Sequence, residues 1–433
     1  MNNGFKRAIK YIVFILAFIL VPQSLNVQSE LNMRVVVSAI AIDYEEGEYS
    51  VTAQVVKPSS TTEGGSAEID FLSAKGKTIV SAVEEVSFIL GRTTGFSHIS
   101  AIILGQGVLK EEKTMEALDY FVREKGILNS ALLLVAEEKA KDELEKTKKL
   151  QLSSAVGIQK TFLYKELNSN AVMMQLQTFF NDYFAKSKCS VISGFKIESK
   201  DEQSGSSSGG GESGGGSSGG GGESSGGGMT GGSSGSSGSS GGSSGGEKDG
   251  RIKFLNNIYV FRDGKLKTEL KEEDELRGIN YINKNSKEGI VTVEKITNEN
   301  MKNANVSLYF RDKKVKLRVQ FNDNSDPTAK ITITTNRNEI YAIETEETNP
   351  KLYETEETYL TEDIKKAVEE KIKDCILKAY TKCQEEGADI LQLGNRLYKQ
   401  NPKKWRELLK QYGEEEYIKH INLDVEVIIK DQI

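Results

Sequence analysis

Histidine, cysteine and tryptophan are scarce in this chain of 433 residues, which has two histidines, three cysteines and one tryptophan. Two histidines exclude a His-rich metal site and leave little room for histidine-dependent catalysis, and three cysteines exclude a disulfide scaffold. Cys375 and Cys383 lie eight apart in a helical pattern, about 12 Å from each other and beyond the reach of a disulfide. We therefore expect these two and Cys189 to be reduced and to fill apolar space.

The chain also has no excess of basic residues: it has 57 Lys and Arg and 63 Asp and Glu, for a net charge of −6. A nucleic-acid-binding protein would carry a basic face. The chain has no Walker loop, no His-Glu-x-x-His, no Cys-x-x-Cys and, outside the Gly/Ser-rich residues 201–250, no Gly-x-Ser-x-Gly. These motifs carry the common phosphate, metal and nucleophile chemistries. Acidic runs such as Glu354–Glu357 are expected to be solvated loops rather than cation sites. We expect no enzyme activity, no cofactor and no metal.

The first 29 residues have the pattern of a secretory leader. Lys6, Arg7 and Lys10 precede the apolar run Tyr11–Val21, as in the n-region and h-region of a signal peptide. Eleven apolar residues span about 16 Å as a helix, against roughly 30 Å of hydrocarbon in a bilayer. Residues 1–29 are therefore predicted to be a signal peptide or, if retained, a short N-terminal anchor.

A low-complexity tract occupies residues 201–250, where 40 of 50 residues are Gly or Ser. Such a segment cannot bury a core. Strand patterns at Ser190–Ser199 and Ile252–Arg262 flank the tract, and loop-closure entropy grows only slowly with loop length. We expect a disordered insertion at 201–250 within a small middle domain, 189–295; a linker between domains is the alternative.

The region before this tract alternates strand and helix patterns. Val35–Ile42 and Tyr49–Val56 predict a β-hairpin, and Glu68–Ala74 a third strand. Apolar spacing predicts a helix over Thr78–Leu90, with Thr78 as N-cap and Gly91 as terminator. Further segments predict strands at 99–104 and 129–136 and helices at 114–124 and 139–148. This order indicates an N-terminal α/β domain over residues 30–188.

The last third predicts a C-terminal α+β domain over residues 296–433. Apolar residues alternate with polar ones between Val306 and Ile333, which predicts a meander with one wet face. Thr361–Glu386 has one apolar stripe and predicts a long helix that ends at Gly387. Shorter helices are expected at 389–398 and 403–412, and a strand at 422–430. The whole chain is predicted to be α+β: an elongated three-domain protein of mixed sheets flanked by helices, with the disordered Gly/Ser insertion.

Two single residues have chemistry of interest. His98 precedes a buried strand and is expected to be structural, although a ligand or switch role is the alternative because histidine titrates near neutral pH. Trp405, the only tryptophan, follows Pro402-Lys403-Lys404. It is expected to pack a short helix against the core, with an exposed partner anchor as the alternative.

The order of several segments resembles the Ger(x)C family, the C subunits of spore germinant receptors. The segments that carry the resemblance are Glu30–Asn32, Val37–Asp43, Tyr49–Pro58, Gly76–Ile79, His98–Gly105, Leu118–Arg123, Val260–Leu266, Glu275–Gly278, Gly387–Gly394 and Pro402–Trp405. Each segment alone is weak, and their order over about 350 residues makes the resemblance fairly specific. The Gly/Ser tract is not part of the family pattern.

The resemblance implies a non-enzymatic, exported protein of three domains. It would work with two membrane-embedded receptor subunits, of A and B type, on the outer face of the spore inner membrane in the response to nutrients. Family members usually end the leader with a lipid-accepting cysteine, and no cysteine precedes Cys189 here. We therefore expect membrane association through the leader or the partners rather than a typical lipoprotein. Candidate partner-contact or structural residues are His98, Gly387, Asp389 and Trp405.

Two functions of other classes remain as alternatives to the receptor subunit. An extracytoplasmic protein could capture a small ligand in a cleft between its domains. A cell-wall hydrolase is a weaker third alternative, because the sequence has none of the catalytic motifs named above.

Overall fold

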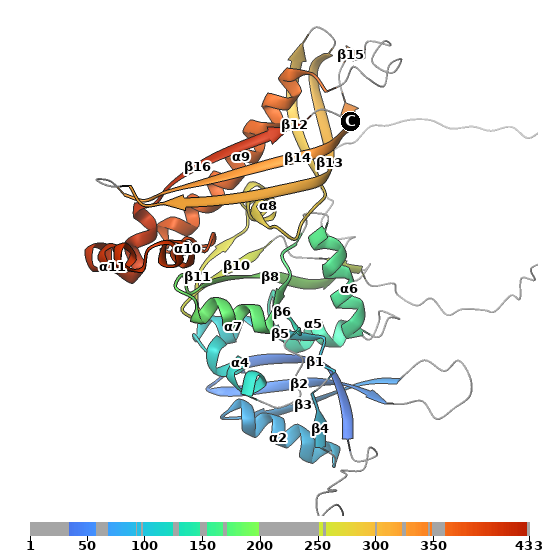
Figure 1. Cartoon of the computed structure of the whole chain (residues 1–433). Coiled ribbons are helices and arrows are strands. Elements are labelled where there is room, and N and C mark those ends of the chain that lie inside the picture. The colour runs from blue at the N-terminus through green and yellow to red at the C-terminus, as the bar shows by residue number, and fades with distance from the viewer. Residues whose placement is uncertain are drawn as a thin grey trace, which may run out of the picture.

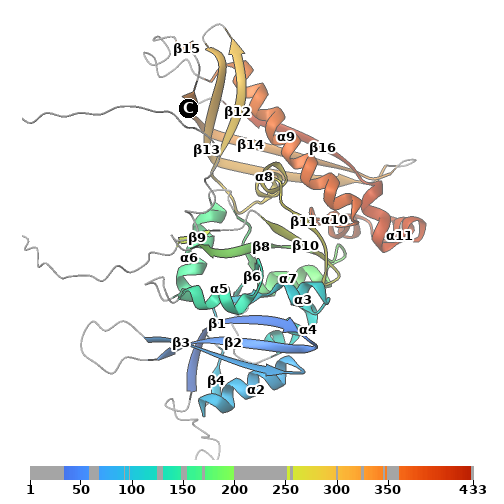
Figure 2. The ribbon, with the colours of Figure 1, turned by 180° about the vertical axis from the view of Figure 1, so that it is seen from behind.

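The structure is a computed structural model, and Figure 1 shows its fold. It describes residues 34–57, 68–91, 93–96, 98–123, 130–147, 154–167, 171–198, 251–253, 257–298, 301–322, 326–344, 347–348 and 360–430. The predicted leader at 1–29, the Gly/Ser tract at 201–250 and the acidic run Glu354–Glu357 lie outside the described residues. The described parts form an elongated molecule with one sheet at each end and helix α8 (Glu273–Ile282) between the two sheets (Figures 1 and 2).

The first sheet has the strand order β11-β10-β8-β6-β5-β1-β2-β3, with β4 beside β1, β7 beside β6 and β9 beside β8. Its strands are β1 (Arg34–Glu45), β2 (Glu48–Lys57), β3 (Glu68–Gly76), β4 (Thr93–Gly95), β5 (Ala101–Leu104), β6 (Leu132–Ala136), β7 (Met174–Gln175), β8 (Cys189–Glu198), β9 (Arg251–Lys253), β10 (Ile258–Arg262) and β11 (Lys265–Leu270). The pairs β1–β5, β5–β6 and β6–β8 are parallel. The hairpin predicted from the sequence is confirmed, because β1 and β2 pair antiparallel, and so is the third strand.

Helices cover both faces of the parallel part of this sheet. One face carries α2 (Ile79–Leu90), α3 (Gln106–Lys110), α4 (Thr114–Arg123) and α7 (Leu176–Phe184), and the other carries α5 (Ala140–Lys146) and α6 (Ser154–Leu167). Along β5, Ile102 and Leu104 belong to the first core, while Ala101 and Ile103 belong to the second. Burial on both faces explains why the central strands are apolar throughout.

The predicted caps of α2 are also confirmed. The Thr78 hydroxyl accepts a hydrogen bond from the Ser81 N–H at 3.1 Å, and Gly91 follows the helix with a φ of 61°. The sequence signals worked here because an N-cap hydroxyl and a left-handed C-terminal glycine act within one helical turn.

The strands on either side of the Gly/Ser tract pair with each other. Strand β8 ends at Glu198 and pairs antiparallel with β9 and β10, which follow the tract. The tract is therefore inserted between neighbouring strands of one sheet. β8 joins β6 through only two residue pairs, Val135–Gly194 and Ala136–Phe195. The division of the chain at residues 188 and 295 stays a prediction.

The second sheet has the order β12-β13-β14-β16, with β15 beside β13. Its strands are β12 (Gly289–Asn298), β13 (Met301–Gln320), β14 (Thr328–Glu344), β15 (Glu347–Thr348) and β16 (Asn422–Ile429). The predicted meander is confirmed by the antiparallel pairs β12–β13 and β13–β14. Its strands are longer than the sequence pattern suggested, since β13 has 20 residues and β14 has 17. The closing strand β16 adds to this sheet parallel to β14.

Helix α9 (Glu362–Glu385) lies across this sheet with the predicted apolar stripe buried: Ile364, Val368, Ile372, Cys375, Ala379 and Cys383. Helix α8 packs on α9 so closely that a Cβ on Gly278 would lie 2.1 Å from the Cys375 carbonyl oxygen. All three cysteines are buried and free, as predicted. The α+β class predicted from the sequence is confirmed.

The chain ends with α10 (Leu393–Gln400), α11 (Pro402–Glu416), the 3₁₀ helix η5 (Tyr417–His420) and β16. The sequence placed the start of α10 at Asp389, four residues too early. Gln392 has a φ of 56°, which an α-helix cannot include. Helix α11 begins at Pro402, because the Asn401 side chain caps it, and it kinks at Gly413, directly after its predicted end.

Candidate functional site

The C-terminal residues singled out from the sequence meet where the C-terminal helices contact the first sheet. Gly387 follows α9 with a φ of 69°, and its N–H and that of Ala388 donate back to the carbonyls of Gln384 and Cys383. A glycine in this conformation closes a helix without strain. A Cβ at position 387 would lie 2.6 Å from the Glu415 carbonyl oxygen. The site therefore accepts only glycine.

Asp389 is a fully buried carboxylate that holds two helices together. It accepts hydrogen bonds from the N–H groups of Leu393 at 2.9 Å and Gly394 at 2.7 Å, which open α10, and from the Tyr417 hydroxyl at 2.8 Å. Burial raises the pKa of Asp389, and the three hydrogen bonds oppose that rise. With both oxygens in use, the carboxylate is structural.

Trp405 is buried beside this carboxylate. Its ring meets the Tyr417 ring edge to face, with centroids 4.9 Å apart and planes at 80°. Gly394 lies against both rings, because a Cβ there would be 2.7 Å from the Tyr417 oxygen and 3.0 Å from the Trp405 ring. The expectation that Trp405 packs a short helix against the core is confirmed, and the exposed-anchor alternative is wrong.

Arg262, at the end of β10, connects these helices to the first sheet. Its buried guanidinium donates to the carbonyl oxygens of Gly387, Glu414 and Glu415, the last at 3.0 Å. Sequence reasoning missed its role, although it stands in the segment Val260–Leu266 that contributed to the family resemblance. A charged residue inside an otherwise apolar strand was the available signal, since a fully buried arginine needs partners. We call Arg262, Gly387, Asp389, Trp405, Glu414, Glu415 and Tyr417 the Arg262 junction.

Polar contacts extend this junction along the end of α7 and the start of β8. The Asn395 side-chain oxygen accepts from the backbone N–H groups of Lys186 at 2.5 Å and Ser187 at 3.2 Å. Lys188 forms an ion pair with Glu414 at 3.1 Å. These bonds come from residues more than 200 positions apart, so the junction fixes the C-terminal helices on the first sheet.

His98 lies apart from the Arg262 junction. It stands exposed in the turn before β5, in the first sheet. The structure therefore brings together Gly387, Asp389 and Trp405, and it leaves His98 on a separate surface.

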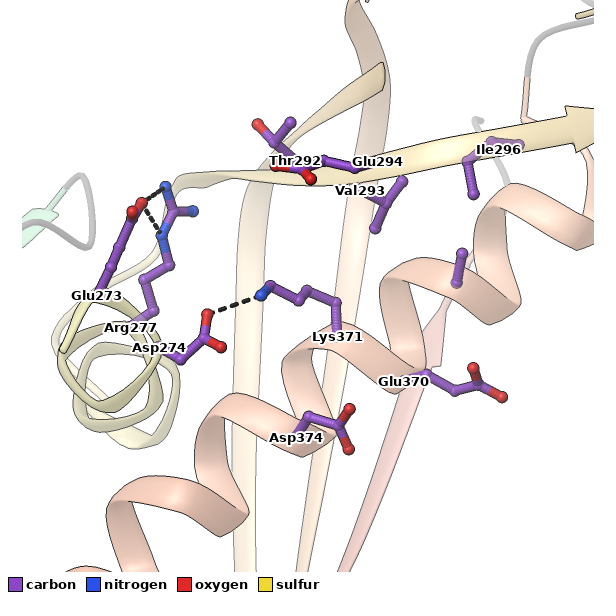
Figure 3. Close-up of a pocket in the computed structure, with 11 residues that line it drawn as sticks. Glu273, Asp274, Arg277, Thr292, Val293, Glu294, Ile296, Glu370, Lys371 and Asp374 are labelled. Carbon is purple, nitrogen blue, oxygen red and sulfur yellow. Dashed lines mark hydrogen bonds and ion pairs between the residues drawn. The ribbon is translucent and has the colours of Figure 1, made fainter. Parts of the chain in front are cut away.

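A charged pocket of about 400 Å³ lies between α8, β12 and α9 (Figure 3). Asp274 on α8 accepts hydrogen bonds from Lys371 at 2.7 Å and Lys378 at 2.5 Å, both on α9. These two bonds lower the pKa of Asp274 to about 2. Beside it, the Arg277 guanidinium binds Glu273 one turn earlier in α8 with N–O distances of 2.6 and 2.9 Å.

Asp274 and Lys371, two of the charged groups that line the pocket, join α8 to α9. Glu275, the next acidic residue of α8, pairs with Lys382 of α9 at 2.8 Å and so extends the same row of contacts. Within the described residues no group of three or more His, Cys, Asp or Glu side chains has the arrangement of a metal site. The geometry of this pocket fits a helix–helix contact better than a reaction centre.

Two family models match this chain. One, described as the spore germination protein N-terminal domain, matches residues 27–197, and the other, described as spore germination B3/GerAC like, C-terminal, matches residues 256–430. Together they span most of the chain. It belongs to the GerAC-like family of spore germination proteins. The resemblance to the Ger(x)C family is thereby confirmed.

Among GerAC-like relatives, the chain is 29% identical to spore germination protein B3 of Bacillus subtilis (strain 168) over 110 residues, 25% of this chain and 29% of that protein. It is 22% identical to spore germination protein KC of the same organism over 211 residues, 46% of this chain and 52% of that protein. The matches therefore span at most about half the length of these relatives. The crystal structure of the GerBC protein is similar with a TM-score of 0.49 and 14% identity, covering 91% of this chain and 96% of that one. Among the residues that the structure describes, no helix has the length and hydropathy of a membrane span.

Proposed function

We propose that this GerAC-like chain is the C subunit of a spore germinant receptor. In this proposal it works with two membrane-embedded subunits, of A and B type, in the response of the dormant spore to nutrients. The match of family models to both halves of the chain carries the proposal. The subunit acts by contact rather than by catalysis, since Asp389 and Arg262 are used in structural hydrogen bonds. The exposed turn at His98 is a candidate partner contact.

The proposed location is the outer face of the spore inner membrane. Exposed apolar side chains on α2 support it, since Phe88 and Ile89 are 81% and 51% exposed. Helix α2 lies at the end of the molecule away from the second sheet (Figures 1 and 2). β1 begins at Arg34, and the 33 residues before it include the apolar run Tyr11–Val21. Exposed aromatic and aliphatic side chains, in a chain whose sequence also carries such a run, suit a lipid interface.

The receptor proposal is tested by recovering the tagged full chain from detergent-solubilised spore membranes. We expect two polytopic membrane proteins of germination to be recovered with it and to be identified by mass spectrometry. A strain that carries the untagged chain is the control. Recovery of the chain only from the soluble fraction, without a membrane partner, would contradict the proposal and favour the extracytoplasmic ligand-binding protein. Deletion of the gene should slow nutrient-triggered germination and leave sporulation intact.

The membrane orientation is tested separately by fluorescence quenching. Phe88→Trp places an indole on the exposed surface of α2, while the native Trp405 is buried and serves as an internal reference. With the full chain bound to vesicles of brominated lipid, we expect strong quenching of the added emission. Phe184→Trp is the matched control, because Phe184 is 77% exposed on α7, away from that end. Equal quenching of both variants would contradict the orientation.

A further inference from the structure

A second pocket, of about 290 Å³, lies where the two sheets and α10 meet. Its size is near the lower limit for small-molecule sites, roughly 300 Å³. Segments of both sheets and of two helices line it: β8, α8, β13, β14, the turn before α10 and α10 itself. The lining residues are Val172, Val191, Ile279, Ile282, Asn283, Lys284, Val315, Leu317, Ile331, Ile390, Leu391, Gln392 and Arg396. We call this site the Arg396 pocket.

The walls of the Arg396 pocket are aliphatic, and its only charges are positive. Nine of the lining residues are Val, Ile or Leu, and none is Asp or Glu. Arg396 and Lys284 are the two charged residues, and within the described residues neither forms an ion pair. By contrast, Lys371, Lys378 and Lys382 on α9 all pair with carboxylates.

Arg396 has a buried hydrogen-bond donor without an acceptor in the described part of the chain. Its Nε is buried and has no hydrogen-bond partner within the part of the chain that the structure describes. Burial and the nearby Arg396 guanidinium lower the pKa of Lys284, so the two cations are close enough to repel each other. Two like charges beside an apolar cavity cost free energy unless an anion lies between them.

The two neutral polar residues of the lining, Asn283 and Gln392, already have partners. The Asn283 side-chain oxygen accepts a hydrogen bond from the Asn285 N–H at 3.0 Å. Gln392 donates its amide to the Cys189 carbonyl, and its side-chain oxygen accepts from Asn395 at 2.6 Å and from Ser187. It therefore does not compensate the charges. Apart from these two amides, the lining consists of the cations Arg396 and Lys284 and of nine aliphatic residues.

We infer that the Arg396 pocket binds a small aliphatic anion, a short branched carboxylate. The carboxylate lies between Arg396 and Lys284, and the hydrocarbon contacts the Val, Ile and Leu side chains. A guanidinium suits this role because it donates two parallel hydrogen bonds to one carboxylate. Since β8 of the first sheet and β13 and β14 of the second all line the pocket, a bound anion would also tie the first sheet to the second.

The test is calorimetric titration of the purified full chain in detergent with isovalerate. Its neutral isostere isovaleramide, which keeps the shape and lacks the charge, is titrated in parallel. We expect isovalerate to bind roughly tenfold or more tightly than the amide, because a charge-assisted hydrogen bond is replaced by a neutral one. Arg396→Gln should weaken isovalerate binding by a similar factor, and Lys284→Gln by less, because Lys284 is exposed. Arg406→Gln, the same charge change on the exposed face of α11, should have no effect.

A second variant separates loss of charge from loss of fold. Val315→Phe fills the cavity and leaves both cations in place, so it should also abolish binding. Equal affinity for acid and amide, or no binding of either, would overturn the inference. Equally tight, Arg396-dependent binding of inorganic phosphate would overturn the aliphatic part of it.

The inference does not depend on the receptor assembly. Binding of isovalerate is measured on the isolated chain, whereas the proposed receptor role is measured by its membrane partners. Failure of one experiment leaves the other interpretable.

Discussion

Arg262 and Arg396 both lie where the C-terminal helices meet the first sheet, yet their surroundings differ. The guanidinium of Arg262 donates to the carbonyls of Gly387, Glu414 and Glu415. The Nε of Arg396 is buried beside an aliphatic cavity and has no partner in the described part of the chain. The Arg262 junction therefore stabilises the fold, whereas in the Arg396 pocket a guanidinium N–H is available to bind a ligand.

The largest effect is expected from Arg262→Ala, which leaves three carbonyls without their donor. Each buried group left unsatisfied costs about 1–3 kcal/mol, so we expect a loss of about 4 kcal/mol in the free energy of unfolding. Chemical denaturation followed by circular dichroism measures it. Arg123→Ala on α4 is the matched control, because the Arg123 side chain is 78% exposed and pairs only with Asp119 one turn away. Such a pair contributes about 0.5 kcal/mol. Similar losses in both variants would remove the contrast between Arg262 and an ordinary surface arginine.

Asp389→Asn is expected to cost about 2 kcal/mol, because an amide cannot accept all three hydrogen bonds of the carboxylate. The contribution of Asp389 to the free energy of unfolding also depends on pH. Burial raises the pKa of Asp389 above 3.8, so the folded protein favours the protonated acid. Relative to Asp389→Asn, the wild type should lose stability as the pH rises from about 4 through the raised pKa. Denaturation of both proteins between pH 4 and 7 checks this, and a constant difference would contradict it.

Lys313 on β13 is a third buried basic residue to compare with Arg262 and Arg396, and like Arg262 it has neutral hydrogen-bond partners. Its ammonium donates to the Asn280 carbonyl at 2.6 Å and to the Ser286 hydroxyl at 3.2 Å, and burial lowers its pKa to about 7. As the pH falls from 10.5 towards 7, the unfolded chain takes up the proton first, so the folded state loses stability. We expect the wild type to lose about 1 kcal/mol relative to Lys313→Met between pH 10 and 9, where the unfolded chain takes up the proton and the folded chain does not. Exposed Lys316→Met, on the same strand, should give no such change.

Much of the fold could be predicted from the sequence, because its signals act over a few residues. The caps Thr78 and Gly91, the apolar stripe of α9 and the alternation in β13 depend on local periodicity. The start of α10 was wrong because the left-handed conformation of Gln392 is set by distant contacts, including the Cys189 carbonyl. Local propensity contains no information on such contacts.

The site was harder to predict for the same reason. Gly387, Asp389 and Trp405 could be singled out as one segment of the family pattern, but Arg262 joins them from a strand 125 residues earlier than Gly387. The Arg396 pocket is lined by residues between Val172 and Arg396. Only the folded chain brings these residues together, and no spacing in the sequence predicts a missing partner for Arg396.

The smallest effect on stability is expected from Arg396→Gln. This variant tests whether Arg396, unlike Arg262, contributes little to the stability of the fold. The substitution removes a guanidinium whose Nε has no partner, and it relieves repulsion with Lys284. We therefore expect the free energy of unfolding to change by less than about 0.5 kcal/mol, or to rise slightly. The pKa of Lys284 should return towards 10.5 in the variant, which NMR of its side chain can follow. A loss near that of Arg262→Ala would mean that Arg396 also stabilises the fold, and the pocket would then have no spare cation for a ligand.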